Sequence, residues 1–239
     1  MRRRGWLRLP AVLLLLVQVA CATAPGTDVR DPLEPLNRSV FRFNEALDGA
    51  VLRPAATVYR DKVPTPMRQG IGNVFANLTD AWSAVNNALQ LKAQATLDST
   101  MRVVVNSVLG LGGVFDVASE MSIERHTRDF GHTLGRWGVG PGPYLVLPVV
   151  GASTLRDTVA LPLDWQGDLV TSLPSVPARN AAVVLRGVDT RAGLLKATTM
   201  LEQVALDPYT FTRDAYLQKR RNDIYDGNPP EDPGESPLP

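Results

Sequence analysis

The chain has 239 residues and a nearly balanced charge, with 25 Lys and Arg against 24 Asp and Glu. This balance excludes a protein built to coat nucleic acid, because such proteins carry a large basic excess. The single cysteine, Cys21, excludes an intrachain disulfide and a metal cluster built on cysteines.

The first twenty residues have the pattern of a signal peptide. Four arginines precede an apolar run at 11–17, which is much shorter than the ~20 residues of a membrane span. Gln18-Val-Ala-Cys21 then resembles the lipobox of bacterial lipoproteins, with Gln18 where Leu is usual. We expect cleavage after residue 20, lipid attachment at Cys21 and, because Ala22 rather than Asp follows, sorting to the outer membrane. A plain secretory signal cut a few residues later is the alternative.

Helical periodicity dominates the remaining chain. Apolar stripes recur over 36–51, 67–78, 81–89, 97–108 and 183–195, and a last helix begins near 206. We expect Pro54 to end the first helix, Pro66 to begin the second, Asp80 to cap the third and Gly110 to follow the fourth. The longest alternating stretch is Tyr144–Val150. The pattern predicts a mainly helical single domain at 31–226, with a lipid-anchored tether at 21–30 before it and a disordered proline-rich tail at 227–239.

Two apolar segments rich in glycine, 110–115 and 131–148, do not fit a soluble helical core. Glycine at this density lets the backbone approach another backbone or a ligand closely. The second segment also contains Pro141, Pro143 and Pro148, so we expect a shaped and stiffened segment rather than a flexible linker. The same prolines obstruct the helix that a phosphate-cradling glycine loop requires, and nucleotide binding is therefore not expected.

Catalytic chemistry has weak support in the sequence. Ser122, His126, Asp129 and His132 lie close together, but no Gly-x-Ser-x-Gly elbow is present. Two histidines six residues apart also fall on different faces of a helix, so they do not share a metal there. We expect these side chains to tie down a loop, with no metal, no cofactor and no enzymatic activity.

Several motifs in order resemble the MlaA (VacJ) family of outer-membrane lipoproteins. The likeness opens with Asp31-Pro32-Leu-Glu-Pro-Leu-Asn37-Arg38 and Phe41-Arg-Phe43-Asn44, and it is densest over 129–148. Thr154-Leu-Arg156-Asp157 and Asp207-Pro-Tyr209 complete it. The match spans about 31–225, nearly all of the expected domain.

The resemblance implies a ring-like domain of short amphipathic helices around a central channel, seated in one leaflet of the outer membrane. Members of the family remove mislocalised phospholipids from the outer leaflet and pass them to a soluble periplasmic carrier, which maintains lipid asymmetry. They also associate with trimeric porins. The expected partners are therefore phospholipid, a porin, a periplasmic lipid carrier and the membrane itself.

The resemblance also suggests site residues. Phe43 and Asn44 are expected to set the position or gating of the channel. The segment Gly138–Pro148, with Gly138, Gly140, Pro141 and Tyr144, is expected to form its wall. Motif residues expected to matter are Asp31, Pro32, Asn37, Arg38, Arg156 and Asp157. Two alternatives stay open: an envelope lipase or phospholipase that uses His126 or His132, and a scaffold that only bridges porins.

Overall fold

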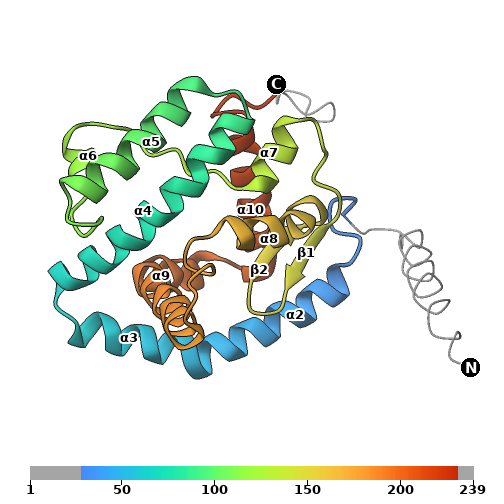
Figure 1. Ribbon diagram of the computed structural model, residues 1–239. Coiled ribbons are helices and arrows are strands. Elements are labelled where there is room, and N and C mark those ends of the chain that lie inside the picture. The colour runs from blue at the N-terminus through green and yellow to red at the C-terminus, as the bar shows by residue number, and fades with distance from the viewer. Residues whose placement is uncertain (1–27, 231–239) are drawn as a thin grey trace, which may run out of the picture.

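The computed structural model describes residues 28–230, which form a mainly helical fold with one small hairpin (Figure 1). The expected mainly helical class is therefore confirmed. The helices are α2 (Glu34–Leu47), the π-helical turn η1 (Asp48–Leu52), α3 (Arg53–Lys62), α4 (Thr65–Leu89), α5 (Ala93–Val108), α6 (Val117–Glu120), α7 (Phe130–Arg136), α8 (Leu155–Gly167), α9 (Val176–Val204) and α10 (Pro208–Ile224). The strands are β1 (Tyr144–Leu147) and β2 (Gly151–Thr154).

The first helix does not end at Pro54, contrary to the sequence prediction. α2, η1 and α3 follow one another without a break along one edge of the molecule, with Pro54 in the first turn of α3 (Figure 1). In η1 the N–H of Arg53 donates to the carbonyl of Asp48, five residues earlier. This widened turn accommodates a proline ring that would collide with the preceding turn of a regular α-helix.

The next two predicted helices are a single helix, α4, which begins with Pro66 in its first turn as expected. Asp80 was expected to cap a new helix, but it lies buried in the middle of α4. Its carboxylate faces Arg102 of the neighbouring α5, with 3.2 Å between Oδ2 and Nε. A buried ion pair between two helices therefore explains an acidic residue that sequence alone places at a helix start.

α5 ends before Gly110, as predicted, and α4 and α5 lie side by side (Figure 1). A Cβ atom at Gly110 would collide with the carbonyl oxygens of Phe115 and Asn106. The chain therefore closes tightly here, and only glycine fits.

The hairpin pairs β1 and β2 in antiparallel register, with Tyr144 opposite Thr154 and Leu147 opposite Gly151. The predicted strand at 144–150 is thus β1 and its turn, whereas β2 was not predicted because Gly-Ala-Ser-Thr has no apolar alternation. Tyr144 and Val146 pack against Tyr209 of α10 to form the largest apolar cluster of the described residues, joined by Val40, Phe41, Ala152, Tyr216 and Leu217.

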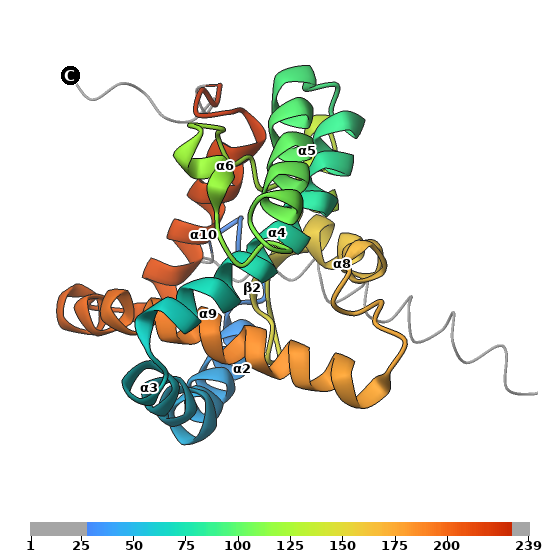
Figure 2. The ribbon, with the colours of Figure 1, turned by 60° about the vertical axis from the view of Figure 1, so that its left-hand side comes forward.

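α9 is the longest helix, and Figure 2 shows it crossing the molecule beside α3. Here Ala56 packs with Ala192 and Leu195, and Tyr59 covers them. The stripe at 183–195 and the last helix near 206 are confirmed as α9 and α10. Within residues 28–230, no helix has the length and hydropathy needed to cross a bilayer.

Candidate functional site

The apolar stripe of α5 faces outward. Leu97, Met101, Val104 and Val108 recur at helical spacing and are 61, 47, 49 and 70 % exposed. The opposite face of the same helix is buried, and it carries Ala95, Ser99, Arg102, Val105 and Asn106. A helix in a water-soluble domain has the reverse arrangement.

The same inversion extends over much of the described surface. In α4 the buried positions are Gly70, Asn77, Asp80, Ser83, Asn86 and Asn87. Large apolar side chains are instead exposed on the glycine loop after α5 and over α8 and the segment that follows it: Leu109, Leu111, Val114, Phe115, Val159, Leu163, Trp165, Leu169 and Leu173. Apolar side chains exposed in this number exceed the scattered single ones of an ordinary surface and indicate contact with a membrane or another apolar partner.

Polar groups accordingly hold the interior together. Among the described residues 18 buried side chains are polar or charged and 12 are hydrophobic. Arg102 is the largest fully buried side chain, and it contacts Asp80, Asp116, Ser119 and the carbonyl of Ile123. These bonds join α4, α5 and α6, so a charged cluster occupies the place of an apolar core.

The opening motif forms a second polar cluster, which fixes α2 to the hairpin and to α10. Asn37 Nδ2 donates to Asp31 Oδ1 at 2.8 Å and to the carbonyl of Tyr144 at 3.0 Å. Asn37 Oδ1 accepts from the N–H of Val146 at 2.9 Å. Asp31 also accepts a bond from the Tyr209 hydroxyl and faces Arg213 at 3.4 Å. Burial, and then the bond to Asp31, raise the pKa of Tyr209, so this hydroxyl stays a donor.

Arg38 performs a similar role one turn along α2. Its guanidinium donates to Asp207 at 2.7 Å and to Glu34 at 2.7 Å, and it lies 4.3 Å from the ring centroid of Tyr209. The bonds from Arg38 and Thr210 hold the pKa of Asp207 well below its usual range. Pro32 precedes α2, between the buried Asp31 and the helix start. Four of the expected motif residues, Asp31, Pro32, Asn37 and Arg38, thus lie at or beside one junction.

Phe43 and Asn44 point to different tasks. Asn44 Nδ2 donates to the carbonyl of Leu147 at 2.9 Å, and its Oδ1 accepts from the N–H of Val149 at 2.8 Å. Both bonds hold the tip of the hairpin against α2. Phe43 is 54 % exposed, so its side chain lies at the surface of α2. Asn44 therefore has a structural role in holding the hairpin, whereas Phe43 is a surface residue.

The residues expected in the channel wall also divide. Gly138, Gly140 and Pro141 are exposed, and a Cβ at either glycine would meet nothing within 4 Å. Tyr144, the first residue of β1, is instead fully buried, and burial, followed by the charge of Asp31, raises its pKa to about 12. The structure therefore places Tyr144 in the core and the other three residues on the surface.

The tight glycines of this segment come earlier in the chain. A Cβ at Gly131 would lie 2.5 Å from Arg220 Nη2 and from Asp157 Oδ1. One at Gly135 would lie 2.8 Å from Arg156 Nη1. These two glycines let two arginines approach the backbone of α7. The sequence predicted a close approach for the segment as a whole but did not say which glycines allow it.

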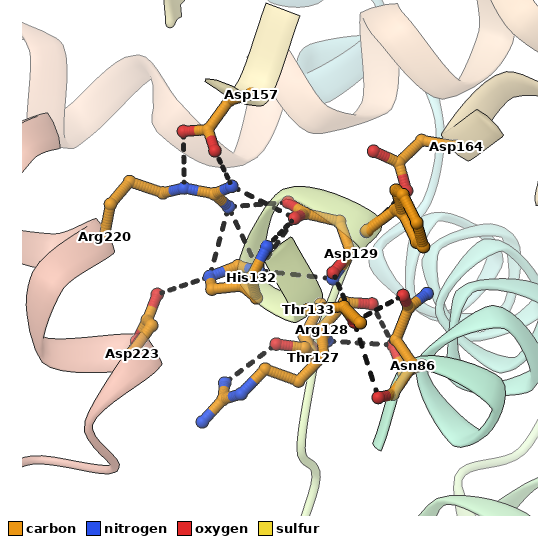
Figure 3. A network of polar contacts seen from close by, with 12 residues as sticks. Asn86, Thr127, Arg128, Asp129, His132, Thr133, Asp157, Asp164, Arg220 and Asp223 are labelled. Carbon is orange, nitrogen blue, oxygen red and sulfur yellow. Dashed lines mark hydrogen bonds and ion pairs between the residues drawn. The ribbon is translucent and has the colours of Figure 1, made fainter. Parts of the chain in front are cut away.

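Arg220 of α10 is the centre of a third polar cluster, drawn in Figure 3. Its guanidinium contacts Asp157 at 2.8 and 3.0 Å and Asp129 at 2.6 and 3.0 Å, so it bridges two carboxylates in a bidentate manner. Tyr216 Oη donates to Asp157 at 2.8 Å. Burial alone would raise the pKa of Asp129, but bonds from His132 and Arg220 hold it well below its usual range. The cluster joins α7, α8 and α10.

Arg156 lies beside this cluster and is also buried. Its Nε donates to Asp157 at 2.9 Å, and Nη1 reaches the carbonyl of Val139 at 3.4 Å. Arg156 and Asp157 therefore connect the start of α8 to the Gly138–Pro143 loop and to Arg220. Both residues were expected to be important as part of the family motif, and their contacts hold α8, the loop and α10 together.

The histidines lie in different surroundings. Asp129 and His132 form a capping box at the start of α7, with Asp129 Oδ1 accepting from the N–H of His132 at 2.9 Å. His126 Nε2 lies 3.1 Å from Asp98 of α5. Within residues 28–230, no set of three His, Cys, Asp or Glu side chains is placed to hold a metal ion.

Part of the predicted site lies beyond the described residues. Cys21, the signal peptide and most of the tether and tail fall there, so lipid attachment and the domain boundaries stay predictions. The end of the predicted tether is attached to the domain: Asp28 faces Arg213 at 3.2 Å, and the carbonyl of Arg30 accepts from the N–H of Tyr144 at 2.8 Å.

Sequence reasoning missed the arginines at the cluster centres, namely Arg102, Arg213 and Arg220. A signal was present for Arg102, because it follows Ser99 and precedes Asn106 on the polar face of a helix whose other face is apolar. Arg213 and Arg220 lie seven residues apart in α10, a spacing that places both on one face of the helix. Nothing in the sequence pairs them with carboxylates 63 to 182 residues away.

Comparisons with known proteins show which family the chain resembles in sequence and in fold. The profile of a family described as MlaA lipoprotein matches residues 29–223. A Shigella flexneri protein named intermembrane phospholipid transport system lipoprotein MlaA is 38 % identical over 227 residues, which cover 89 % of this chain and 87 % of that protein. The Haemophilus influenzae protein of the same name is 32 % identical over 236 residues, covering 92 % of this chain and 90 % of its own.

A solved structure described by the words "Structural basis for maintenance of bacterial outer membrane lipid asymmetry" has a similar fold. It matches with a TM-score of 0.71 and 37 % sequence identity, covering 83 % of this chain and 99 % of that one.

Proposed function

Because the chain belongs to the MlaA lipoprotein family, we propose that it removes mislocalised phospholipids from the outer leaflet of the outer membrane and passes them to a soluble periplasmic carrier. This retrograde transport would maintain the lipid asymmetry of the membrane. The role involves no catalysis and no cofactor. The proposal assigns to this chain the phospholipid transport that the names of its relatives state.

The observation that carries the proposal is the outward apolar face of α5, together with the apolar loop after it. The described helices leave Leu97, Met101, Val104 and Val108 about half exposed or more. Contact with acyl chains would remove this surface from water at about 25 cal/mol per Å². Since none of the described helices is able to span a bilayer, the domain is proposed to sit in one leaflet.

In this proposal the helices surround a central channel as a ring, and phospholipid moves through it. Phe43, Gly138, Gly140 and Pro141 offer exposed surface to the lipid. Asn44 and Tyr144 act indirectly, because they fix the hairpin that carries this loop. Lipid chains on Cys21 would hold the protein in the periplasmic leaflet of the outer membrane, with a trimeric porin beside it.

The test is deletion of the gene followed by measurement of phospholipid in the outer leaflet, with a membrane-impermeant reagent that labels surface amines. We expect accumulation in the deletion strain and its reversal by the wild-type gene. Unchanged outer-leaflet phospholipid would overturn the transport proposal and favour a scaffold that bridges porins. Crosslinking in cells would identify the porin and the carrier that contact the protein.

A further inference from the structure

A cavity of about 270 Å³ lies between α4, α9 and the segment that joins α6 to α7. Its residues on α4 recur at the spacing of one helix face, and the other walls contribute charged and hydroxyl side chains. The lining consists of Gly72, Phe75, Ala76, Thr79 and Asp80 from α4, Arg125 and Thr127 from the connecting segment, and Arg186, Asp189 and Thr190 from α9.

The cavity is amphipathic. Phe75 and Ala76 make an apolar wall, while Arg125 and Arg186 come from two other elements. Arg186 donates one side-chain hydrogen bond within the described chain, from Nη2 to Asp168 at 2.6 Å. A guanidinium has five N–H donors, so most of the donors of Arg186 remain available. Arg125 faces Asp80 at 3.3 Å and Asp116 at 3.5 Å, both longer than a strong charge-assisted bond.

Asp189 is the second unusual charge in this lining. The Tyr59 hydroxyl donates to Asp189 Oδ1 at 2.9 Å. No Lys, Arg or His of residues 28–230 forms an ion pair with this carboxylate. Gly72 leaves room for it, because a Cβ there would lie 3.3 Å from Asp189 Oδ2. The lining therefore combines a carboxylate that has no ion-pair partner among the described residues with two arginines. This combination suits a ligand that carries both a positive and a negative charge.

We propose that this cavity binds the head group of a zwitterionic aminophospholipid. The phosphate is contacted by Arg186 and Arg125, and the primary ammonium by Asp189. Arg186 and Asp189 stand three residues apart on α9, and such positions lie about 5–6 Å apart on one helix face, close enough for adjoining charges of a single head group. The apolar wall of Phe75 and Ala76 receives the glycerol end. This inference rests on the proposed transport function and names its preferred substrate.

The balance of charge favours a zwitterion over an anionic lipid. The lining carries two cations, Arg125 and Arg186, and two carboxylates, Asp80 and Asp189. A phosphatidylglycerol head group would satisfy the arginines but would leave Asp189 without a cation. Since an uncompensated charge next to a bound ligand weakens binding, the cavity should discriminate for a primary amine.

The experiment places a photo-reactive amino acid at position 76 of the full-length lipoprotein in cells, replacing Ala76 in the apolar wall. Lipids captured on irradiation are identified by mass spectrometry, and the ratio of phosphatidylethanolamine to phosphatidylglycerol is compared with that of the whole membrane. We expect enrichment of phosphatidylethanolamine. Arg186→Gln should reduce total capture about tenfold, the effect of losing one charge-assisted hydrogen bond. Asp189→Asn should abolish the enrichment.

Asp168→Asn is the matched control for Arg186→Gln. It removes the ion pair of Arg186 but leaves the guanidinium in the cavity, so capture should be retained. Arg179→Gln removes a charge from the same helix outside the cavity and should also have no effect. If Asp168→Asn lowers capture as much as Arg186→Gln does, the loss comes from α9 packing and the proposal is wrong. Should Arg186→Gln not accumulate, Arg186→Lys keeps a cation there and must retain capture.

The outcome can be separated from that of the transport proposal. Accumulation of surface phospholipid in the deletion strain, with no lipid captured at position 76, would overturn the cavity proposal alone. Capture whose lipid ratio equals that of the membrane would overturn the head-group preference. If the deletion causes no accumulation, the transport proposal fails whatever position 76 captures.

Discussion

The side-chain amide of Asn44 holds the tip of the hairpin, where its Oδ1 accepts a hydrogen bond from the N–H of Val149 at 2.8 Å. Val149 has a positive φ of 68°, which is unfavourable for a β-branched residue. The bond from α2 therefore stabilises a turn conformation that the local sequence disfavours. Two elements separated by about a hundred residues thus depend on one amide group.

Asn44→Ala should loosen the hairpin, because it removes this bond and the one to Leu147. At about 1 kcal/mol per bond we expect a loss of roughly 2 kcal/mol, measured as a lower thermal midpoint in detergent. Outer-leaflet phospholipid should change at unchanged protein level.

Phe43→Ala is the companion variant. The side chain of Phe43 is exposed, so lipid asymmetry should change while the thermal midpoint does not. An intact membrane barrier in both variants would contradict their role.

Arg220→Gln should be strongly destabilising. It leaves Arg156 as the one cation paired with the buried carboxylate of Asp157 among the described residues, and it removes the arginine paired with Asp129. Loss of one partner from a buried ion pair costs about 3–5 kcal/mol. The free energy of unfolding in urea measures the loss, and Arg136→Gln, an exposed arginine of α7, is the control. Equal stability of the two variants would show that the Arg220 cluster does not hold the helices together.

Acid should destabilise the protein through Asp116. Burial alone would raise the pKa of this carboxyl, but bonds from Ser119, Asn106 and Arg102 lower it to about 2. A carboxylate with a lowered pKa contributes stability above its unfolded value, about 4, and loses it as pH falls toward about 2. We expect a thermal midpoint that is constant above about pH 5 and falls below it. In Asp116→Asn the acid-dependent part should shrink by about 2 kcal/mol, and an unchanged slope would exclude Asp116 as its source.

Replacement of the histidines separates transport from hydrolysis. His126→Ala and His132→Ala should leave lipid transport in place, whereas a lipase that used either ring would lose activity. His132→Ala also removes half of a capping box, so we expect about 1 kcal/mol less stability for this variant. Measurement of outer-leaflet phospholipid and of released fatty acid in the same cells decides between the two functions. Transport lost in both variants at normal protein level would favour the enzyme.

Cys21→Ala should move the protein from the membrane to the soluble periplasmic fraction. Stable anchoring needs more than one acyl chain, and both expected attachment points, the sulfur and the amine, belong to this residue. Fractionation, followed by mass spectrometry of the mature N-terminus, measures the effect. Recovery of an acylated variant in the membrane would rule out the lipobox interpretation.

The sequence allowed prediction of helices far better than of what they face. Apolar spacing located α5 and α9, and proline located the start of α4, because both signals are local. The continuous helix through Pro54 could not be foreseen, since it depends on a π-helical turn that no single residue specifies. The side on which Leu97 and Met101 lie is set by polar partners in α4 and α6, and hydropathy alone does not reveal them.

The site was predictable only in part for the same reason. Motif residues such as Asp31, Asn37 and Asp157 were identified, and they do lie in buried clusters. Their partners Arg213 and Arg220 come from the last helix, and pairings over such separations leave no trace in one sequence. The amphipathic cavity beside α9 also combines three distant segments, so it could not be found before the fold was known.

The polar interior has a consequence for how such a chain tolerates change. Where the outer face contacts fluid acyl chains, as we propose, its side chains need only be apolar, so Leu, Ile, Val, Met and Phe should exchange there freely. A hydrogen-bonded ion pair requires a particular side-chain length and a particular direction of each donor. Even Arg102→Lys should therefore destabilise the fold, whereas Leu97→Phe should be tolerated. A library of random variants would therefore show constraint and freedom in places opposite to those of a water-soluble helical domain.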